Sequence, residues 1–216
     1  MPQPFPRHLD NPQFTIGHAA TQRPDLFTRG MDVIAHHSQI DALLIAAMVH
    51  LLGTDPEPAM VMLAAINNNN IKQKAYIELA RNRLNDEDVA IFEGVLAACT
   101  SADKERNRLA HDLWATEPQL PDSVVLINAR EYSKIAARSH LLQDATDLSS
   151  EAPEALIRTI RASGLVYVSD DFVRIRRQMS ETFFLVVALQ NMLDQRTPEK
   201  EIARQRQQLR ERLGIS

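Results

Sequence analysis

The chain of 216 residues has little cysteine, glycine or aromatic content, with one Cys, six Gly and 5% aromatic residues. Its single cysteine, Cys99, excludes an intramolecular disulfide and any zinc site built on several cysteines, which is typical of proteins of the reducing cytosol. The scarcity of glycine, beside many Ala, Leu, Arg and Gln residues, favours helix over sheet. The composition therefore predicts a mostly α-helical protein.

Long hydrophobic runs are also missing. The longest, residues 42–52, contains His50 and is too short to span a bilayer, and prolines at positions 2, 4 and 6 stand where a secretory signal needs an apolar segment. We expect a cytoplasmic protein without a membrane partner. The net charge of −4 argues against nonspecific coating of nucleic acid, so any contact with a polyanion should be local.

Proline spacing and hydrophobic periodicity divide the chain into three parts. Residues 1–24 hold five of the eleven prolines and are expected to form an extended arm. Residues 25–197 are expected to form one helical bundle domain, and residues 198–216 a charged C-terminal helix. The predicted fold class is all-α, a bundle of four to six helices with a small two-stranded β ribbon.

Local signals place the individual elements. Gly53 is expected to close the first long helix, the asparagines at 67–70 favour a turn and a cap, and Asn85 is expected to cap the helix that follows. Two short apolar runs rich in β-branched residues have strand character. The predicted helices lie at about residues 25–52, 56–66, 71–84, 86–115, 130–140, 153–162, from 169 onward and 199–213, and the predicted strands at 124–127 and 165–168.

Two charged residues fall on the apolar seam of the helix predicted over 86–115. Continued past Cys99 in steps of four and three, this seam reaches Asp103 and Arg106, and then Ala110 and Leu113. Because burying an unpaired charge is costly, Asp103 and Arg106 must meet each other, another polar partner or a water-filled cleft.

Asn107 and His111 lie beside this seam. They are four residues apart and share a helix face, so the amide can orient the imidazole. Arg106 and His111 are separated by about 140° around an ideal helix, and they converge only if the long arginine side chain reaches across.

The first long helix carries a second polar interruption, formed by His37, Ser38 and Asp41. Antiparallel packing would bring these residues to Arg106, and Asp41 is the expected partner of Arg106 or His111. A metal pair is the alternative, because His37 and Asp41 are four residues apart. It needs further ligands that no local pattern supplies.

The string ERNRLAHDLW, residues 105–114, is expected to lie on a long helix and resembles the signature of the HEPN superfamily of all-helical, RNA-directed proteins. Arg106, the polar Asn107 directly after it, and His111 carry the resemblance. It covers residues 105–114 in motif and about residues 25–115 in architecture, the HEPN-like core. Residues 116–197 would add the ribbon and further helices.

Many HEPN members are metal-independent ribonucleases, often toxins or antiviral effectors, whose two motifs face each other across a homodimer cleft. The resemblance therefore implies a homodimeric endoribonuclease that needs no cofactor, with RNA as its substrate and a cognate antitoxin or other protein as a partner. An RNA 2′-hydroxyl would attack the adjacent phosphate. His111 would act in acid–base catalysis, Arg106 would stabilise the developing charge, and Asn107 would hold the imidazole or a phosphate oxygen.

The alternative function is noncatalytic. Arg106 and His111 would then belong to a structural polar layer together with Asp103, Asp41, His37 and Ser38, while Trp114 fills the core. Such a chain would be a helical RNA-binding or protein-interaction module.

Overall fold

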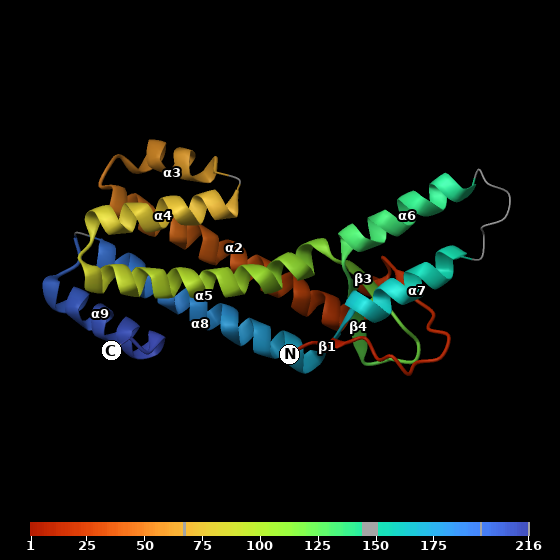
Figure 1. Ribbon diagram of the computed structural model, residues 1–216. Coiled ribbons are helices and arrows are strands. Elements are labelled where there is room, and N and C mark those ends of the chain that lie inside the picture. The colour runs from red at the N-terminus through yellow and green to blue at the C-terminus, as the bar shows by residue number, and fades with distance from the viewer. Residues whose placement is uncertain (67, 144–150, 195, 216) are drawn as a thin grey trace. The chain divides into compact units, whose positions relative to one another are not determined.

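The computed structural model describes residues 1–66, 68–143, 151–194 and 196–215, which form nine helices and one five-stranded antiparallel sheet (Figure 1). The helices are α1 (Ala19–Gln22), α2 (Pro24–Leu52), α3 (Pro56–Ala64), α4 (Asn69–Arg83), α5 (Asp86–His111), α6 (Ala129–Gln143), α7 (Glu151–Ser163), α8 (Ser169–Leu193) and α9 (Glu199–Leu213). The strands are β1 (Gln3–Pro4), β2 (Thr15–Ile16), β3 (Leu113–Thr116), β4 (Ser123–Ile127) and β5 (Leu165–Val168). The predominantly helical character is confirmed, but the described residues contain more helices and more strands than expected.

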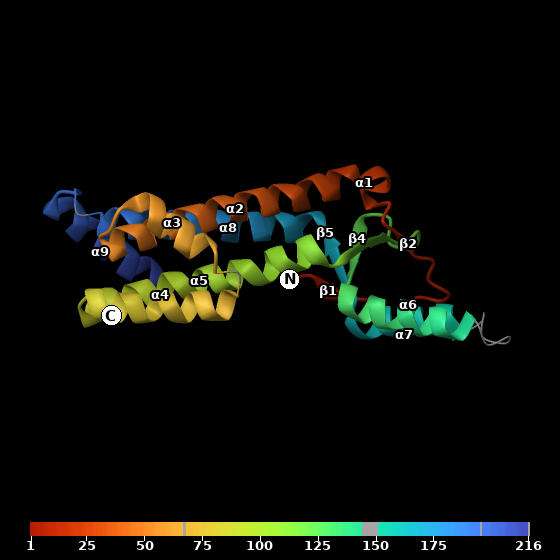
Figure 2. The ribbon, with the colours of Figure 1, turned by 90° about the horizontal axis from the view of Figure 1, so that it is seen from above.

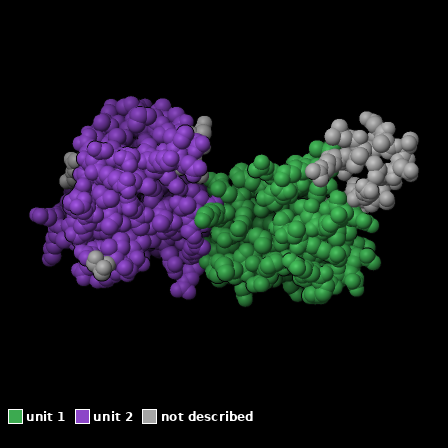
Figure 3. Space-filling model, in the orientation of Figure 1, with its two compact units in different colours: residues 1–34, 104–176 green, residues 35–103, 177–216 purple. Residues whose placement is uncertain are grey.

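The chain folds into two compact units, coloured separately in Figure 3. Unit 1 consists of residues 1–34 and 104–176, and unit 2 of residues 35–103 and 177–216. Each of α2, α5 and α8 contributes residues to both units. This division differs from the expected sequence of arm, bundle domain and C-terminal helix, because segments far apart in the chain pack together. No helix in the described ranges combines the length and apolarity needed to cross a membrane.

The sheet belongs to unit 1 and has the strand order β1-β5-β4-β3-β2. The two predicted strands, β4 and β5, pair at its centre, with Val125 opposite Val166. The other three strands were not predicted. Two of them, β1 and β2, come from the N-terminal segment that was expected to be an extended arm, and each covers two residues. Strands this short carry too little pattern to be recognised before their partners are known.

Side chains of each strand point alternately to the two faces of the sheet, and each face packs against different elements. On one face, Val125 and Ile127 pack with Ile160 of α7 and with Phe5 in an apolar cluster. Figures 1 and 2 show α6 and α7 side by side. On the other face, the aromatic ring of Trp114 contacts rings of α2 and α8, with centroid distances of 5.4 Å to Phe27 and 6.0 Å to Phe172.

The expected continuation of α5 through about residue 115 is wrong, and ERNRLAHDLW is helical only as far as His111. The last helical hydrogen bond runs from the Asp112 N–H to the Arg108 carbonyl, at 2.9 Å. Trp114 then lies in β3 opposite Leu126, and its indole N–H donates to the Leu109 carbonyl at 2.9 Å. Strand pairing and the indole hydrogen bond to a carbonyl at the helix end therefore stabilise an extended backbone at Trp114, although the residue pattern there continues that of the helix.

Unit 2 is helical, and its helix ends follow the predicted signals. Gly53 ends α2 with a φ of +64°, a left-handed conformation that suits glycine. The side chain of Asn68 caps α4 by accepting hydrogen bonds from the N–H groups of the second and third following residues, at 3.0 and 3.2 Å. Asn85 caps α5 by accepting from the Asp88 N–H at 2.9 Å. Of the predicted asparagine turn, Asn67 lies outside the described residues.

The predicted charged C-terminal helix is confirmed as α9. Although this helix is rich in charged residues, one side of it is packed against the protein, and Leu209 is completely buried. Arg206 binds the buried carboxylate of Asp88 through two hydrogen bonds, at 2.6 and 2.9 Å. This bidentate geometry is the strongest form of arginine–carboxylate pairing, and it attaches α9 to the first turn of α5 within unit 2.

We expect Gly30→Ala to destabilise unit 1. A Cβ atom at this position of α2 would lie 2.4 Å from Cη2 of Trp114, a rigid ring held between two others. Overpacking of this kind costs about 1–3 kcal/mol, more than the roughly 1 kcal/mol that alanine gains over glycine in a helix. Circular dichroism melts should show a lower unfolding temperature. In the control Gly94→Ala, the new Cβ would meet the end of the Leu213 side chain, with its shortest distance 2.9 Å to a terminal methyl group, and this flexible side chain can move away. An equal effect of both substitutions would contradict the explanation.

Candidate functional site

The last two turns of α5 line an open pocket of about 800 Å³ in unit 1. Asn107 and His111 both line it, as expected for residues four apart on one helix face. The pocket is completed by the junctions that lead into α6 and out of α7. Its other lining residues are Arg108, Asp112, Asn128, Arg130, Glu131, Ser163 and Leu165.

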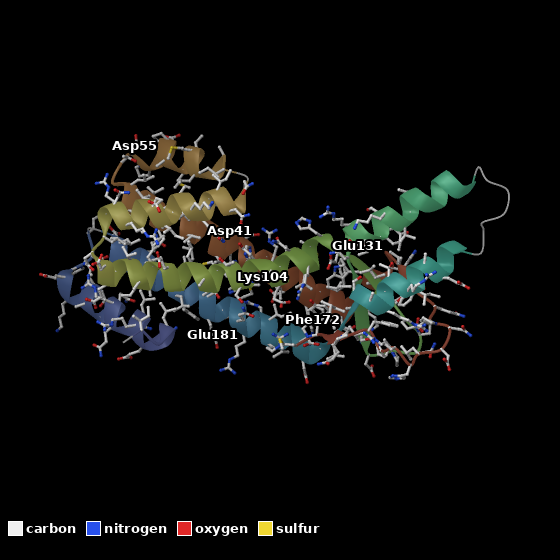
Figure 4. The ribbon with its side chains drawn as sticks, viewed as in Figure 1. Asp41, Asp55, Lys104, Glu131, Phe172 and Glu181 are labelled. Atoms are coloured by element: carbon white, nitrogen blue, oxygen red, sulfur yellow. The ribbon has the colours of Figure 1, made fainter. Side chains whose placement is uncertain are left out.

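The acidic and amide side chains of this pocket form hydrogen bonds with other groups of unit 1. The side-chain oxygen of Asn128 caps α6 by accepting hydrogen bonds from the N–H groups of Arg130 and Glu131, at 3.1 and 3.2 Å. Glu131, labelled in Figure 4, accepts a 2.6 Å hydrogen bond from Lys134, which lowers the pKa of its carboxyl. Burial raises the pKa of Asp112, against the opposing effect of a hydrogen bond from the backbone N–H at the start of α6.

The basic groups of the pocket are accessible from solvent. The side chain of Arg108 is 46% exposed, and Arg130 and His111 are exposed as well. Arg108 forms an ion pair with Glu105 at 3.6 Å, a long contact that water screens. Because arginine presents a planar fork of N–H donors, two arginines beside a histidine can bind the oxygens of a phosphate group and place it next to an acid–base catalyst.

Arg106 does not join His111 in this pocket, as their separation of about 140° around an ideal helix predicts. It is half-buried, it is not among the residues that line this pocket, and its Nη1 donates a 2.9 Å hydrogen bond to the side-chain oxygen of Asn107. The predicted seam is wrong at Ala110, which is exposed, whereas Asp103 and Arg106 are half-buried. The fully buried residues of this part of α5 are Ala102 and Leu109, each one position before a residue of the predicted seam, Asp103 and Ala110.

The remaining predicted site residues belong to unit 2. His37 is 1% exposed, its Nε2 lies 2.5 Å from Oδ1 of Asp103, and its Nδ1 lies 3.7 Å from Oδ2 of Asp41. The structure thus brings together three of the four residues expected to join Arg106 and His111 in a polar layer, whereas Ser38 is exposed. The pairing of Asp41 with Arg106 or His111 stays a prediction.

The pocket residues that the sequence did not identify include Arg108, Asn128 and Arg130. Asn128 stands three positions before Glu131, a spacing that is typical of a helix N-terminus and marks the start of α6. Arg108 lies less than one turn before His111 on the same helix. No local sequence pattern predicts that Arg130 lies in the same pocket as Arg108 and His111. Its position depends on the path of the chain through β3 and β4, which separate it from α5.

The two groups of residues offer different chemistry. The pocket of unit 1 combines anion-binding side chains with a histidine, and the cluster of unit 2 combines a buried histidine with two carboxylates. Comparisons of the chain with family models, with curated proteins and with solved structures find no match.

Proposed function

We propose that the pocket at the end of α5 binds the phosphodiester backbone of RNA, and that the chain is a metal-independent endoribonuclease. The observation that carries the proposal is the presence of His111 in one open pocket with two exposed arginines, Arg108 and Arg130. RNA is proposed as the substrate because ERNRLAHDLW resembles the HEPN motif. The pocket supports this choice, because it places acid–base and phosphate-binding groups together.

In the proposed reaction, the 2′-oxygen of a ribose attacks the adjacent phosphorus. Neutral His111 accepts the 2′-hydroxyl proton as the new P–O bond forms, and the bond from phosphorus to the 5′-oxygen breaks as that oxygen takes up a proton. The products are a 2′,3′-cyclic phosphate and a 5′-hydroxyl. Arg108 and Arg130 stabilise the charge that develops on the phosphate oxygens.

Arg106 is proposed as a positioning residue rather than a phosphate ligand. Its hydrogen bond to Asn107 holds the amide at the pocket wall, one helical turn before His111. In the homodimer that the resemblance implies, a second copy of the chain would supply its own His111 to protonate the leaving oxygen. One histidine would then act as the base and the other as the acid.

A noncatalytic RNA-binding or protein-interaction module is the second candidate function. The half-burial of Arg106 and its bond to Asn107 favour it, because both features fit a structural polar layer that needs no substrate. The two candidates differ in whether bound RNA is cut.

The test is incubation of the purified full chain with a single-stranded RNA, and with DNA of the same sequence, in the presence of EDTA. We expect the RNA to be cut and the DNA to stay intact, because DNA lacks the 2′-hydroxyl nucleophile. Mass spectrometry should find 2′,3′-cyclic phosphate ends. RNA that is bound but not cut would support the noncatalytic candidate. A need for added metal, or cutting of the DNA, would rule out the mechanism.

A further inference from the structure

A second, much smaller cavity of about 30 Å³ lies within unit 2, among side chains of α2, α4 and α5. His37 and Asp41 of α2, Tyr76 of α4 and Asp103 of α5 line it. Its volume suits a single water molecule or a single metal ion. Asp41 is labelled in Figure 4.

The donor atoms around this cavity form a compact set. One imidazole nitrogen of His37 and one carboxylate oxygen each from Asp41 and Asp103 lie within 4.8 Å of one another. His37 is almost completely buried, while the side chains of Asp103 and Asp41 are 20% and 41% exposed. The set therefore combines a fixed nitrogen ligand with two carboxylates, one of which is accessible to an entering ion.

Tyr76 supplies an independent sign that the cavity holds something polar. Its side chain is 1% exposed and lines the cavity, and its hydroxyl has no hydrogen-bond partner in the described part of the chain. A buried hydroxyl without a partner is rare and costly. Cys99 also lines the cavity, but its sulfur is not part of the donor set that lies within 4.8 Å.

We propose that His37, Asp41 and Asp103 bind one Zn²⁺ ion, which links α2 to α5. A neutral imidazole with two carboxylates balances the charge of the ion, and a water molecule or the hydroxyl of Tyr76 takes the fourth position. Neighbouring ligands of tetrahedral zinc lie about 3.4 Å apart. The 3.7 Å between Nδ1 of His37 and Oδ2 of Asp41 is close to this spacing. Asp103 contacts the other ring nitrogen, Nε2, at 2.5 Å, so its carboxylate must turn from this nitrogen to the ion, which the 4.8 Å limit on the donor set allows.

A protonated His37, donating a hydrogen bond to each carboxylate, is the competing arrangement and needs no ion. Lys72 also lines the cavity, with its ammonium group 5.9 Å from the ring centroid of Tyr76, and its charge opposes a second cation. Zinc must therefore displace the His37 proton and outweigh this repulsion. Direct binding measurements distinguish the two arrangements.

Isothermal titration of chelator-treated full-length protein with ZnCl₂ is expected to show one ion per chain, and saturating zinc should raise the unfolding temperature by several degrees. MgCl₂ should not bind, because Mg²⁺ requires oxygen ligands in octahedral geometry. Asp41→Asn and Asp103→Asn should each weaken zinc binding by about 10-fold or more, and His37→Ala should abolish it. In the matched control Asp55→Asn, the same change is made at the N-cap of α3, away from the cavity, and binding should be unaffected.

Absence of zinc binding to the folded chain would overturn the proposal. So would unchanged affinity in Asp103→Asn, or equal binding of Mg²⁺. If His37→Ala does not fold, as judged by circular dichroism, Asp41→Asn decides, because its side chain is partly exposed and its replacement disturbs packing little. RNA cleavage in EDTA depends on residues of unit 1 and zinc binding on residues of unit 2, so either can fail without the other.

Discussion

Replacement of His111 by alanine is expected to lower the rate of RNA cleavage by about 100- to 10,000-fold, the usual loss when a general acid or base is removed. The unfolding temperature should hardly change, because the side chain is exposed at the end of α5 and its removal leaves no cavity. The measurement is the single-turnover rate on a defined RNA in EDTA, beside a thermal melt of each variant.

His8→Ala is the matched control, since His8 is an exposed histidine of the same unit that does not line the pocket. It should cleave RNA as the unmodified chain does. Arg106→Ala should lose both activity and stability, because this side chain is half-buried and bonded to Asn107. Full activity of His111→Ala would exclude its catalytic role. A large loss of stability in that variant would instead favour the structural polar layer.

Trp114→Ala is expected to lower the stability of unit 1 by about 3 kcal/mol, the lower end of the cost of removing a large aromatic side chain from a core, because Trp114 is half-buried. The ring packs between Phe27 and Phe172, and its N–H donates to the Leu109 carbonyl at the end of α5. The substitution therefore creates a cavity and leaves a helix-end carbonyl without its partner. For a chain of this size, the unfolding temperature should fall by roughly 10 °C in a circular dichroism melt.

Trp114→Phe serves as the comparison, because phenylalanine keeps an aromatic ring in the layer and loses the indole N–H. It should cost less than the alanine variant. The smaller ring should also make room at Gly30, so Gly30→Ala should be better tolerated in the Trp114→Phe background than alone. Strict additivity of these two changes, or a Trp114→Ala variant as stable as the unmodified chain, would contradict the packing described for this face of the sheet.

Signals that act over a few residues allowed much of the fold to be predicted. Gly53, Asn68 and Asn85 end or begin helices where their backbone and hydrogen-bonding preferences place them. The strands β4 and β5 were recognised because their β-branched apolar runs stand out between helical stretches. The same reasoning failed at Trp114, where a helical pattern continued past the last helical residue, and at the two-residue strands near the N-terminus.

The candidate sites were predicted less completely. Asn107 and His111 were placed together by helical spacing, but the arginines of their pocket, Arg108 and Arg130, were not recognised. Arg106 is half-buried and has a polar partner in Asn107, as its place on the seam required. His37 and Asp41 were seen as a possible ligand pair, while Asp103, 66 positions after His37, could not be added to it from any local pattern.

The sequence by itself determined that the protein is mostly helical, where most of its helices begin and end, and which polar residues interrupt their apolar faces, because caps and helical periodicity act over one or two turns. Only the tertiary structure decided that the chain divides into two discontinuous units, that α5 stops at His111, and that Asp103 meets His37. Strand pairing and contacts between helices depend on residues far apart in the chain, so no local pattern specifies them.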